Sequence, residues 1–248
     1  MLIGRDVAFA LDPVLFAAAC GVVCDPWQAA LLRARPNRAL LNCSRQSGKS
    51  TVCAVLGLHT AIFTPGTTVV IVSPTQNQSA ELLRTVRGLH AHLDGAPRLD
   101  AESVLKIELD NGSRIRALPG TERSVRGMVA DLVIFDEASR CEDSLFTACR
   151  PMVATTGGAL ILLSTPAGKR GEFFKLWHND DPTWTRVRVP VSECRRISAE
   201  FLAGELKDMG PARYSEEYLL EFVDNDAAAF PTDIIDRAFT SEFRALWI

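Results

Sequence analysis

The chain has 248 residues, a hydrophobic fraction of 47% and a formal net charge of −3. This size allows one α/β core with a small appendage, and the charge argues against a uniformly basic surface that coats nucleic acid. Because no apolar run approaches the length of a membrane span and the N-terminus lacks the pattern of a signal peptide, we expect a soluble, cytoplasmic protein with no membrane partner.

The first predicted elements are helical. Residues 13–35 have a partly amphipathic pattern that is interrupted at Asp25 and Pro26. Proline suits the first turn of a helix and aspartate is a favoured N-cap, so a second helix is expected to begin at Pro26.

The most informative segment comes next. Residues 38–43 predict a strand, and a helix is predicted from Lys49 and Ser50 to about residue 63. A strand, a tight loop and a helix that opens with Lys-Ser are typical of triphosphate binding, because loop N–H groups and the helix N-terminus surround the phosphates. We expect Lys49 to reach the β- and γ-phosphates and the Ser50 hydroxyl to bind Mg²⁺. The predicted nucleotide-binding residues of this loop are Ser44, Arg45, Gln46, Ser47, Gly48, Lys49, Ser50 and Thr51.

One position departs from the general phosphate-loop pattern G-x-x-x-x-G-K-[ST]. Cys43 stands where that pattern has its first glycine. The alternative interpretation is a chance Gly-Lys-Ser sequence in a surface turn, since short motifs recur by accident. The segments that follow favour the functional interpretation.

The middle of the chain alternates between predicted strands and helices. Residues 67–73 are rich in β-branched side chains and predict a strand, and residues 76–93 predict a helix. Two further strands, 103–109 and 113–118, flank Asp110-Asn111-Gly112. Asn-Gly accepts the positive φ angles of a tight turn, so these two strands are predicted to form a hairpin at the side of the sheet.

An apolar run that ends in two carboxylates indicates a second part of the phosphate site. Residues 131–137 have the length and composition of a strand buried on both faces of a parallel sheet. Its carboxyl end is where α/β sheets bind ligands, so Asp136 is expected to hold Mg²⁺ and Glu137 to polarise the attacking water. The alternative is a buried strand followed by a solvated, acidic helix start.

A third strand is predicted after a helix over residues 141–154. Residues 158–163 are apolar and lead into Ser164, Thr165 and Pro166. Hydroxyl groups at the end of a neighbouring strand can contact the γ-phosphate, so Ser164 and Thr165 are predicted to couple phosphate loss to movement. The alternative is a strand that ends in an ordinary turn.

The pattern changes beyond about residue 168. Helices are predicted over 172–179, 198–209 and 211–223, with a strand over 183–189 between them. The aromatic residues of the last helix, Tyr214, Tyr218 and Phe222, are spaced to lie on one packed face. We therefore expect a core of mostly parallel strands with helices on both faces in residues 1–168, a small lid in 169–231 and a linker in 232–248.

Three segments together resemble one family. Residues 44–50, 133–138 and 163–166 look like the ATPase domain of large terminase subunits, the motors that package DNA into tailed-phage capsids. Residues 25–28, 124–127 and 214–231 resemble further segments of that family. The resemblance implies a P-loop ATPase fold of the RecA-like type, with ATP and Mg²⁺ as cofactors.

The resemblance also implies roles for individual residues. Trp27 and Gln28 would contact adenine, Arg45 would contact the γ-phosphate, and Arg126 would act as an arginine finger from a neighbouring subunit. The alternative is that these residues have structural roles only. Trp27 and Gln28 would then anchor a surface helix, and Arg126 would form a loop ion pair, with Arg123 close by.

The implied partners are those of a packaging motor. They are the backbone of double-stranded DNA, the portal of the procapsid, the small terminase subunit and further copies of the chain in a ring. In isolation the chain is expected to be a monomer and a slow ATPase. The family adds a nuclease domain whose carboxylates would begin about where this sequence stops, so nuclease activity is not expected here.

Two rival functions remain at this stage. A two-core DNA helicase shares the Asp-Glu strand, but the residues after Gly168 are too few for a second core. A nucleotide-binding assembly module that hydrolyses nothing would have no use for a water-polarising carboxylate at Glu137.

Overall fold

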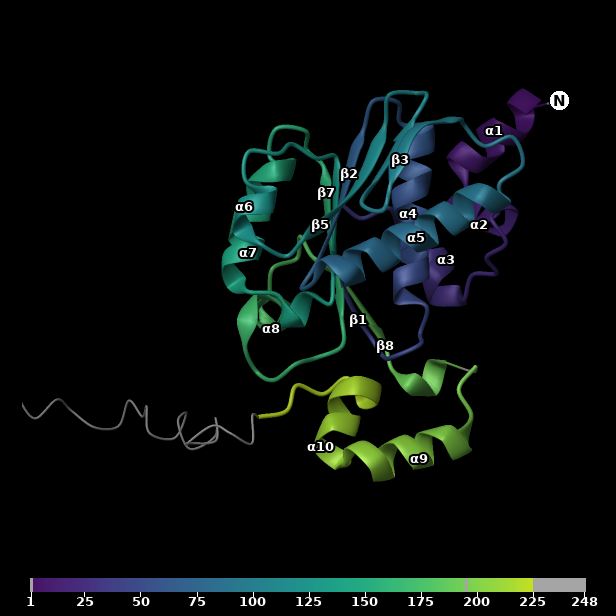
Figure 1. The fold of residues 1–248 in the computed structure, drawn as a ribbon. Helices are drawn as coiled ribbons and strands as arrows, with labels where there is room; N and C mark the ends of the chain where they lie inside the picture. Colours follow the sequence, from purple (N-terminus) through teal and green to yellow (C-terminus); the bar gives the residue numbers. More distant parts are fainter. Residues whose placement is uncertain (1, 195, 225–248) are drawn as a thin grey trace, which may run out of the picture.

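An eight-stranded sheet forms the centre of the computed structural model, which describes residues 2–194 and 196–224 (Figure 1). The strand order is β3-β4-β5-β2-β6-β7-β1-β8. All neighbours from β5 to β8 pair in parallel, whereas β4 runs antiparallel to β3 and β5. The strands are β1 (Arg38–Cys43), β2 (Thr68–Ser73), β3 (Leu99–Ser103), β4 (Lys106–Leu109), β5 (Arg114–Pro119), β6 (Leu132–Asp136), β7 (Ala159–Ser164) and β8 (Thr185–Val189).

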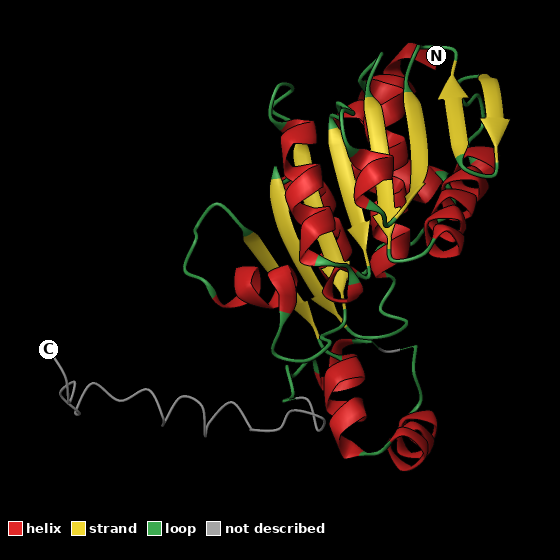
Figure 2. Cartoon of the chain, turned by 60° about the vertical axis from the view of Figure 1, so that its left-hand side comes forward, coloured by secondary structure: helices red, strands yellow, loops and turns green. Residues whose placement is uncertain are grey.

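Helices cover both faces of this sheet (Figure 2). Buried side chains of α2 to α5 pack on one face, and those of α6 to α8 pack on the other. The pair α9 and α10 lies beyond the carboxyl ends of β1 and β8 (Figure 1). The helices are α1 (Leu2–Leu11), α2 (Pro13–Ala19), α3 (Pro26–Ala34), α4 (Lys49–Phe63), α5 (Gln76–His92), α6 (Glu122–Val125), α7 (Asp143–Cys149), α8 (Gly171–His178), α9 (Ala199–Met209) and α10 (Pro211–Tyr214). Short helical turns are η1 (Ala138–Arg140), η2 (Arg150–Val153), η3 (Val191–Glu193) and η4 (Ser215–Leu219).

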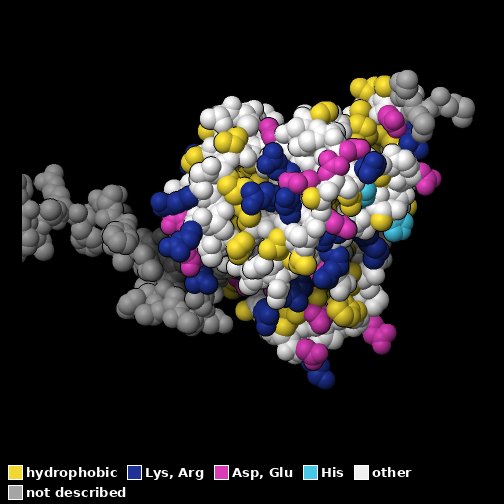
Figure 3. Space-filling model, turned by 45° about the horizontal axis from the view of Figure 1, so that its top comes forward, with side chains coloured by type: hydrophobic (Ala, Val, Ile, Leu, Met, Phe, Trp, Pro, Cys, Tyr) yellow, Lys and Arg dark blue, Asp and Glu magenta, His cyan; other side chains and the backbone are white. Residues whose placement is uncertain are grey.

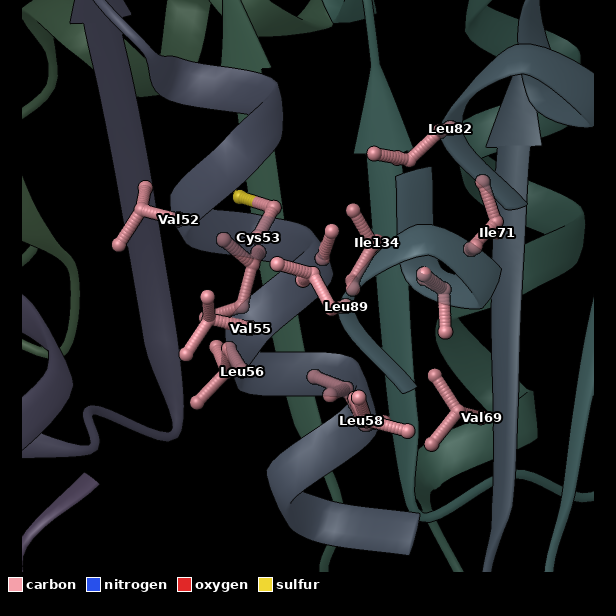
Figure 4. Close-up of a cluster of buried hydrophobic side chains, with 14 of the residues drawn as sticks. Val52, Cys53, Val55, Leu56, Leu58, Val69, Ile71, Leu82, Leu89 and Ile134 are labelled. Carbon is pink, nitrogen blue, oxygen red and sulfur yellow. The ribbon is translucent and has the colours of Figure 1, made fainter. Parts of the chain in front are cut away.

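The packing of α4 fixes the loop that precedes it. Apolar side chains of α4 point toward strand residues such as Ile134 and Val69, and Leu82 and Leu89 of α5 complete the cluster (Figure 4). A Cβ atom added at Gly57 would lie 3.4 Å from Ile134 Cδ1 and 3.5 Å from Val69 Cγ1, so α4 runs close to the sheet. Because interiors are densely packed, this close contact leaves α4 little freedom relative to β2 and β6.

Most predicted elements are present, with small shifts at their ends. The hairpin around Asp110-Asn111-Gly112 is confirmed as β4 and β5, and the break in the N-terminal helical region falls between α2 and α3. The helix predicted over 141–154 is α7 followed by η2. Pro151 accounts for this early end, because proline cannot donate the backbone hydrogen bond of a continuing α-helix. Helix α1 and strand β3 were not predicted.

Two predictions for the C-terminal part were wrong in detail. The strand predicted inside the lid is β8, which pairs with β1 in the main sheet, starting with Ala39 opposite Thr185. The helix predicted over 211–223 ends earlier, since Leu220 adopts a left-handed conformation with φ 63°. Phe222 therefore leaves the face of the preceding tyrosines and packs on α8, 5.2 Å from the Phe174 ring. The lid boundaries stay a prediction, and the predicted linker 232–248 lies outside the described residues.

In the described part of the chain, no helix has both the length and the apolar character that a membrane span needs.

Candidate nucleotide-binding site

The loop between β1 and α4 has a backbone that few residues accept. Gln46 and Gly48 have positive φ angles of 56° and 86°. A Cβ atom at Gly48 would lie 2.6 Å from Gln28 Nε2, so this glycine is required by conformation and by space. The chain then enters α4 at Lys49, where the first N–H groups of the helix have no partners within the helix and point into the loop.

Gly48→Ala should destabilise the protein. An alanine at φ 86° and against the Gln28 amide should lower the free energy of unfolding by about 1–2 kcal/mol, measured by urea denaturation. The matched control is Gly88→Ala in α5, where a Cβ atom meets nothing within 4 Å and alanine should be neutral or stabilising. Equal stabilities of the two variants would contradict this explanation of Gly48.

Two of the predicted catalytic groups lie together. Lys49 Nζ is 3.7 Å from Glu137 Oε1, and Lys49 is 8% exposed. Glu137 follows β6 directly in a left-handed conformation, with φ 52° and ψ 44°, which is uncommon for a residue other than glycine. Such conformations concentrate at functional sites, where the surrounding structure holds them. The loop and the end of β6 thus converge although they are almost ninety residues apart in the chain.

Asp136 is buried beside this pair, with 8% of its surface exposed. Burial, together with the charge of Glu137, raises the pKa of Asp136 to about 6, although Lys49 acts in the opposite direction. The strand pairing of Val72 with Phe135 places Ser73 next to Asp136 at the end of β2. The Ser73 hydroxyl is buried and has no hydrogen-bond partner among the residues that the structure describes.

These groups fit a divalent cation that is shared with a ligand. A buried carboxylate with a raised pKa gains from a nearby cation, and Ser50 opens α4 one residue after Lys49. Within residues 2–194 and 196–224, no cluster of three or more His, Cys, Asp or Glu side chains could hold a metal by itself. Mg²⁺ is commonly bound by one or two protein groups together with phosphate oxygens, and this donor set matches that mode.

The two predicted coupling residues contact different elements, Thr165 the turn η4 and Ser164 the turn after β6. Thr165 is 1% exposed, and its hydroxyl donates to Glu217 Oε2 at 2.9 Å. Ser164 is fully buried, and its hydroxyl accepts a hydrogen bond from Ser139 N at 3.2 Å. Hydrogen bonds therefore connect the end of β7 both to η4, which belongs to the predicted lid, and to the turn that follows β6.

Arg45 also contacts η4. Its Nε and Nη2 atoms donate to the two oxygens of Glu217 at 3.0 Å and 3.2 Å, and Arg45 N donates to Glu217 O. Burial acts to raise the pKa of Glu217, but the hydrogen bonds from Arg45 and Thr165 and the charge of Arg140 outweigh it and hold this pKa below its usual value. The predicted contact of Arg45 with a γ-phosphate stays a prediction.

A cleft of about 350 Å³ opens where these elements meet. Its lining residues come from the loop, α4, α5, the turn after β6 and the lid. They are Arg45, Gln46, Lys49, Gln78, Glu137, Arg140 and Glu217. Five of its side chains are cationic or amide donors, which suits an anionic ligand with several oxygen atoms.

The remaining loop residues have mainly structural contacts. Ser44 is fully buried, its N–H donates to Val189 O, and its hydroxyl lies 3.5 Å from Cys194 Sγ. Ser47 is also buried, and within residues 2–194 and 196–224 its hydroxyl has no hydrogen-bond partner. Cys43 is the last residue of β1 and fully buried, so the loop turns only after it. Ser50 and Thr51 lie half-buried in the first turn of α4.

Trp27 and Gln28 are placed differently from each other. Gln28 is 2% exposed; its Oε1 accepts from Asp25 N at 2.8 Å, and its Nε2 donates to Gly48 O at 3.1 Å. It therefore anchors α3 to the loop. Trp27 lines a separate pocket of about 480 Å³ with Asp25 and Arg196. Arg196 Nη2 donates to Ser47 O at 3.3 Å, so this pocket adjoins the loop.

Arg126 is not brought into the cleft. It caps α6, its side chain is 69% exposed, and it forms an ion pair with Glu122. Among the described residues of one chain, it contacts none of those that line the cleft. This position agrees with the prediction that Arg126 acts on a neighbouring subunit, and it agrees equally with the alternative that Arg126 only forms a loop ion pair.

Three cleft residues were missed from the sequence. Gln78 gave no signal, and Glu217 lay in the segment 214–231 that shares the family resemblance but was not assigned to the site, because its position there depends on the fold. Arg140 did give one: it lies three residues after Glu137, a spacing at which opposite charges on a helical turn meet.

Comparisons with known proteins identify relatives of the chain. Residues 40–237 match a family described as terminase large subunit, T4likevirus-type, N-terminal. The chain is also similar to a probable terminase large subunit of Enterobacteria phage P7, with 24% identity over 184 residues. That match covers 66% of this chain and 37% of the relative, so the chain spans little more than a third of that protein.

Solved structures share the fold. A mutant ATPase domain of the large terminase from Thermus phage P74-26 has a TM-score of 0.73 and 20% identity, covering 84% of this chain and 98% of that one. The large terminase of the thermophilic bacteriophage D6E in complex with ADP has a TM-score of 0.64 and 14% identity, covering 86% and 53%. The predicted fold, a mostly parallel sheet with flanking helices as in terminase ATPase domains, is confirmed.

Proposed function

This chain belongs to the terminase large-subunit family of the T4likevirus type, and we propose that it is an ATP-hydrolysing motor domain that drives double-stranded DNA into a phage procapsid. The observation that carries the proposal is the 3.7 Å approach of Lys49 Nζ to Glu137 Oε1 beside the buried Asp136. A cation at the start of a helix, a second carboxylate in the same cleft and a buried carboxylate next to it in the chain are the parts that triphosphate hydrolysis needs.

The loop and α4 bind the triphosphate. Free N–H groups at the start of α4 and the Lys49 ammonium surround the phosphates, and the bound phosphates take Lys49 away from Glu137. One oxygen of Glu137 is then free to accept a hydrogen bond from the attacking water and to orient it toward the γ-phosphate. This carboxylate is the feature that separates a hydrolase from a nucleotide-binding assembly module.

Ser50 and Asp136 are the residues that would hold Mg²⁺ together with phosphate oxygens. When bound, the ion neutralises part of the phosphate charge that develops during transfer. Asp136 sits on a buried strand, so its carboxylate is held in place before any ligand arrives. The pocket that adjoins the loop, with Trp27 as one wall, is the site we assign to the purine base.

The lid is coupled to the phosphate site through Glu217. Its carboxylate accepts hydrogen bonds from Arg45 of the loop and from Thr165 at the end of β7. A γ-phosphate in the cleft competes with Glu217 for the Arg45 guanidinium. A guanidinium can bind two oxygens of a phosphate at once, which a lysine ammonium does less well. Loss of that phosphate returns Arg45 to Glu217, so the lid contact follows the state of the nucleotide.

The assembled motor needs partners that a single chain does not contain. We propose a ring of chains around DNA, in which Arg126 of one subunit completes the site of the next, together with the portal and the small terminase subunit. DNA would be held through its phosphate backbone without base readout. Figure 3 shows a face on which Lys and Arg side chains gather with acidic side chains among them, and this mixed pattern agrees with local contacts rather than a continuous basic surface.

Lys49→Ala tests the proposal most directly. Charge-assisted hydrogen bonds contribute about 1.5–3 kcal/mol, so removal of the ammonium should weaken ATP binding by about tenfold to a hundredfold and abolish hydrolysis. Titration with a fluorescent ATP analogue and phosphate release over hours would measure both effects. The control is Lys207→Ala, at an exposed position on α9. A wild-type chain that binds no purine nucleotide would overturn the proposed function.

A further inference from the structure

We infer that Arg140 is a positioning residue for Glu137, which it holds by one carboxylate oxygen and connects to the lid. This inference rests on the proposed function, because it concerns the carboxylate that orients the attacking water. Arg140 belongs to the short turn η1 that follows β6.

Three hydrogen bonds define the position of the guanidinium. Its Nη1 atom donates to Glu137 Oε2 at 2.8 Å and to Thr165 Oγ1 at 3.1 Å. Its Nη2 atom donates to Glu217 Oε1 at 2.9 Å. The guanidinium is planar and rigid, so a single orientation of Arg140 satisfies all three acceptors. If one acceptor shifts, Arg140 either follows it and loses the other two contacts or loses the contact with the acceptor that moved.

The two oxygens of Glu137 have different partners. Oε2 accepts from Arg140 at 2.8 Å, whereas Oε1 faces Lys49 Nζ at 3.7 Å. A triphosphate attracts Lys49 because it carries more charge than one carboxylate. Oε1 then loses its partner and becomes available to water, while Oε2 stays with Arg140. The carboxylate is thereby freed at one oxygen and still oriented by the other.

The backbone places Arg140 where it can do this. Arg140 N donates to Glu137 O at 2.9 Å, which closes the turn η1 and brings the two side chains to the same side. The left-handed backbone of Glu137, with φ 52°, starts that turn directly at the end of β6. The ion pair is therefore formed within a fixed local frame, since β6 is buried on both faces.

The contact with Glu217 makes the position of Glu137 depend on the lid. Glu217 has a side chain that is 3% exposed, and Arg45 and Arg140 are its cationic partners. If Arg45 turns to a γ-phosphate, Arg140 remains as the cation that neutralises this buried carboxylate, because an unpaired buried charge is costly. Arg140 thus links Glu137 to the lid while nucleotide is bound.

Arg140→Gln tests the inference against its control Arg84→Gln, an exposed arginine on α5 whose partner is Glu81. Misplacement of a catalytic group by about 1 Å can lower the rate by about a hundredfold, so we expect kcat to fall by about tenfold to a hundredfold. Without nucleotide, the thermal midpoint should stay close to that of the wild type because Arg45 still pairs with Glu217. The Kd for a fluorescent ATP analogue should rise, because ATP then draws Arg45 away and leaves the buried Glu217 carboxylate unpaired, so kcat is measured at saturating ATP. Arg140→Lys keeps the charge and one contact, and it should recover part of kcat.

A double variant separates positioning from a general structural role. If Arg140 acts through Glu137, then Arg140→Gln should cause no further loss of kcat in a Glu137→Gln background, since groups that act as a unit are not additive. Additive losses, or a kcat of Arg140→Gln within twofold of the Arg84→Gln control, would overturn the inference. If Arg140→Gln does not fold, the Arg140→Lys variant decides: full wild-type kcat with that side chain would overturn it as well. A wild-type chain without hydrolysis would instead refute the proposed function.

Discussion

Glu137→Gln should leave ATP binding within about twofold of the wild type and lower turnover by about a hundredfold to ten-thousandfold. Glutamine has the same shape and keeps an oxygen that can accept from Arg140, but its amide is a poor acceptor for a proton from water. Binding is preserved because the phosphate contacts come from the loop and Lys49 rather than from Glu137. The variant should therefore hold ATP without turning it over.

The measurement is phosphate release under single-turnover conditions, together with binding of a fluorescent ATP analogue. Glu81→Gln is the matched control, because Glu81 is an exposed glutamate on α5 with an arginine partner of its own. Turnover of Glu137→Gln within a few-fold of this control would show that Glu137 is not the group that orients the water. Loss of binding would place Glu137 in nucleotide recognition instead.

The parts of the site that were predictable from the sequence are those with local signals. The Lys49 loop combines an apolar strand, a glycine with positive φ and a helix start, and each is set by neighbouring residues. Asp136 and Glu137 were predictable because an apolar run of this length specifies a buried parallel strand, and the carboxyl ends of such strands meet at one edge. The meeting of Lys49 with Glu137 followed from these two signals and the sheet topology.

The lid contacts were not predictable, because they join distant residues. Arg45 and Glu217 are 172 positions apart, and no periodicity marks a glutamate that becomes buried only when η4 packs on the loop. The sequence suggested a phosphate partner for Arg45 from its place in the loop. The structure shows Glu217 as the partner of Arg45, and the contact with a phosphate stays a prediction.

The position of β8 as an edge strand of the main sheet was also not predictable from the sequence. Strand β8 has the composition of a strand, but nothing in residues 183–189 specifies β1 as its neighbour. An edge strand has a neighbour on one side only, and most residues of β8 are exposed or half-buried. The segment therefore lacks the apolar pattern of a central strand and was assigned to the lid. The early end at Leu220 was equally hidden, since a leucine with positive φ is rare and has no sequence signature.

Asp136→Asn should make the free protein more stable at neutral pH. Burial and the charge of Glu137 raise the pKa of Asp136 from 3.8 to about 6, so the folded state binds the Asp136 proton more tightly than the unfolded chain does. The stabilisation that tighter proton binding gives the folded state is fully present below the pKa of Asp136 in the unfolded chain, and it is lost as pH rises through about 6. At pH 7.5 the ionised carboxylate therefore costs up to about 3 kcal/mol, which asparagine removes.

Urea denaturation in EDTA at pH 7.5 and at pH 4 would measure this effect. The increase in the free energy of unfolding of Asp136→Asn over the wild type should be largest at pH 7.5 and small at pH 4, where Asp136 is protonated in the folded wild type. Asp94→Asn, at an exposed position after α5, serves as the control and should change little. A variant that is less stable than the wild type at both pH values would contradict the raised pKa.

The same variant should lose the response to magnesium. With Mg²⁺ and a non-hydrolysable ATP analogue, the thermal midpoint of the wild type should rise more than that of Asp136→Asn, because ligands that bind the folded state stabilise it by mass action. The two halves of this prediction have one cause, since the carboxylate that destabilises the free protein is the one that a cation neutralises. An unchanged magnesium response in a more stable variant would mean that Asp136 is strained for a reason other than metal binding.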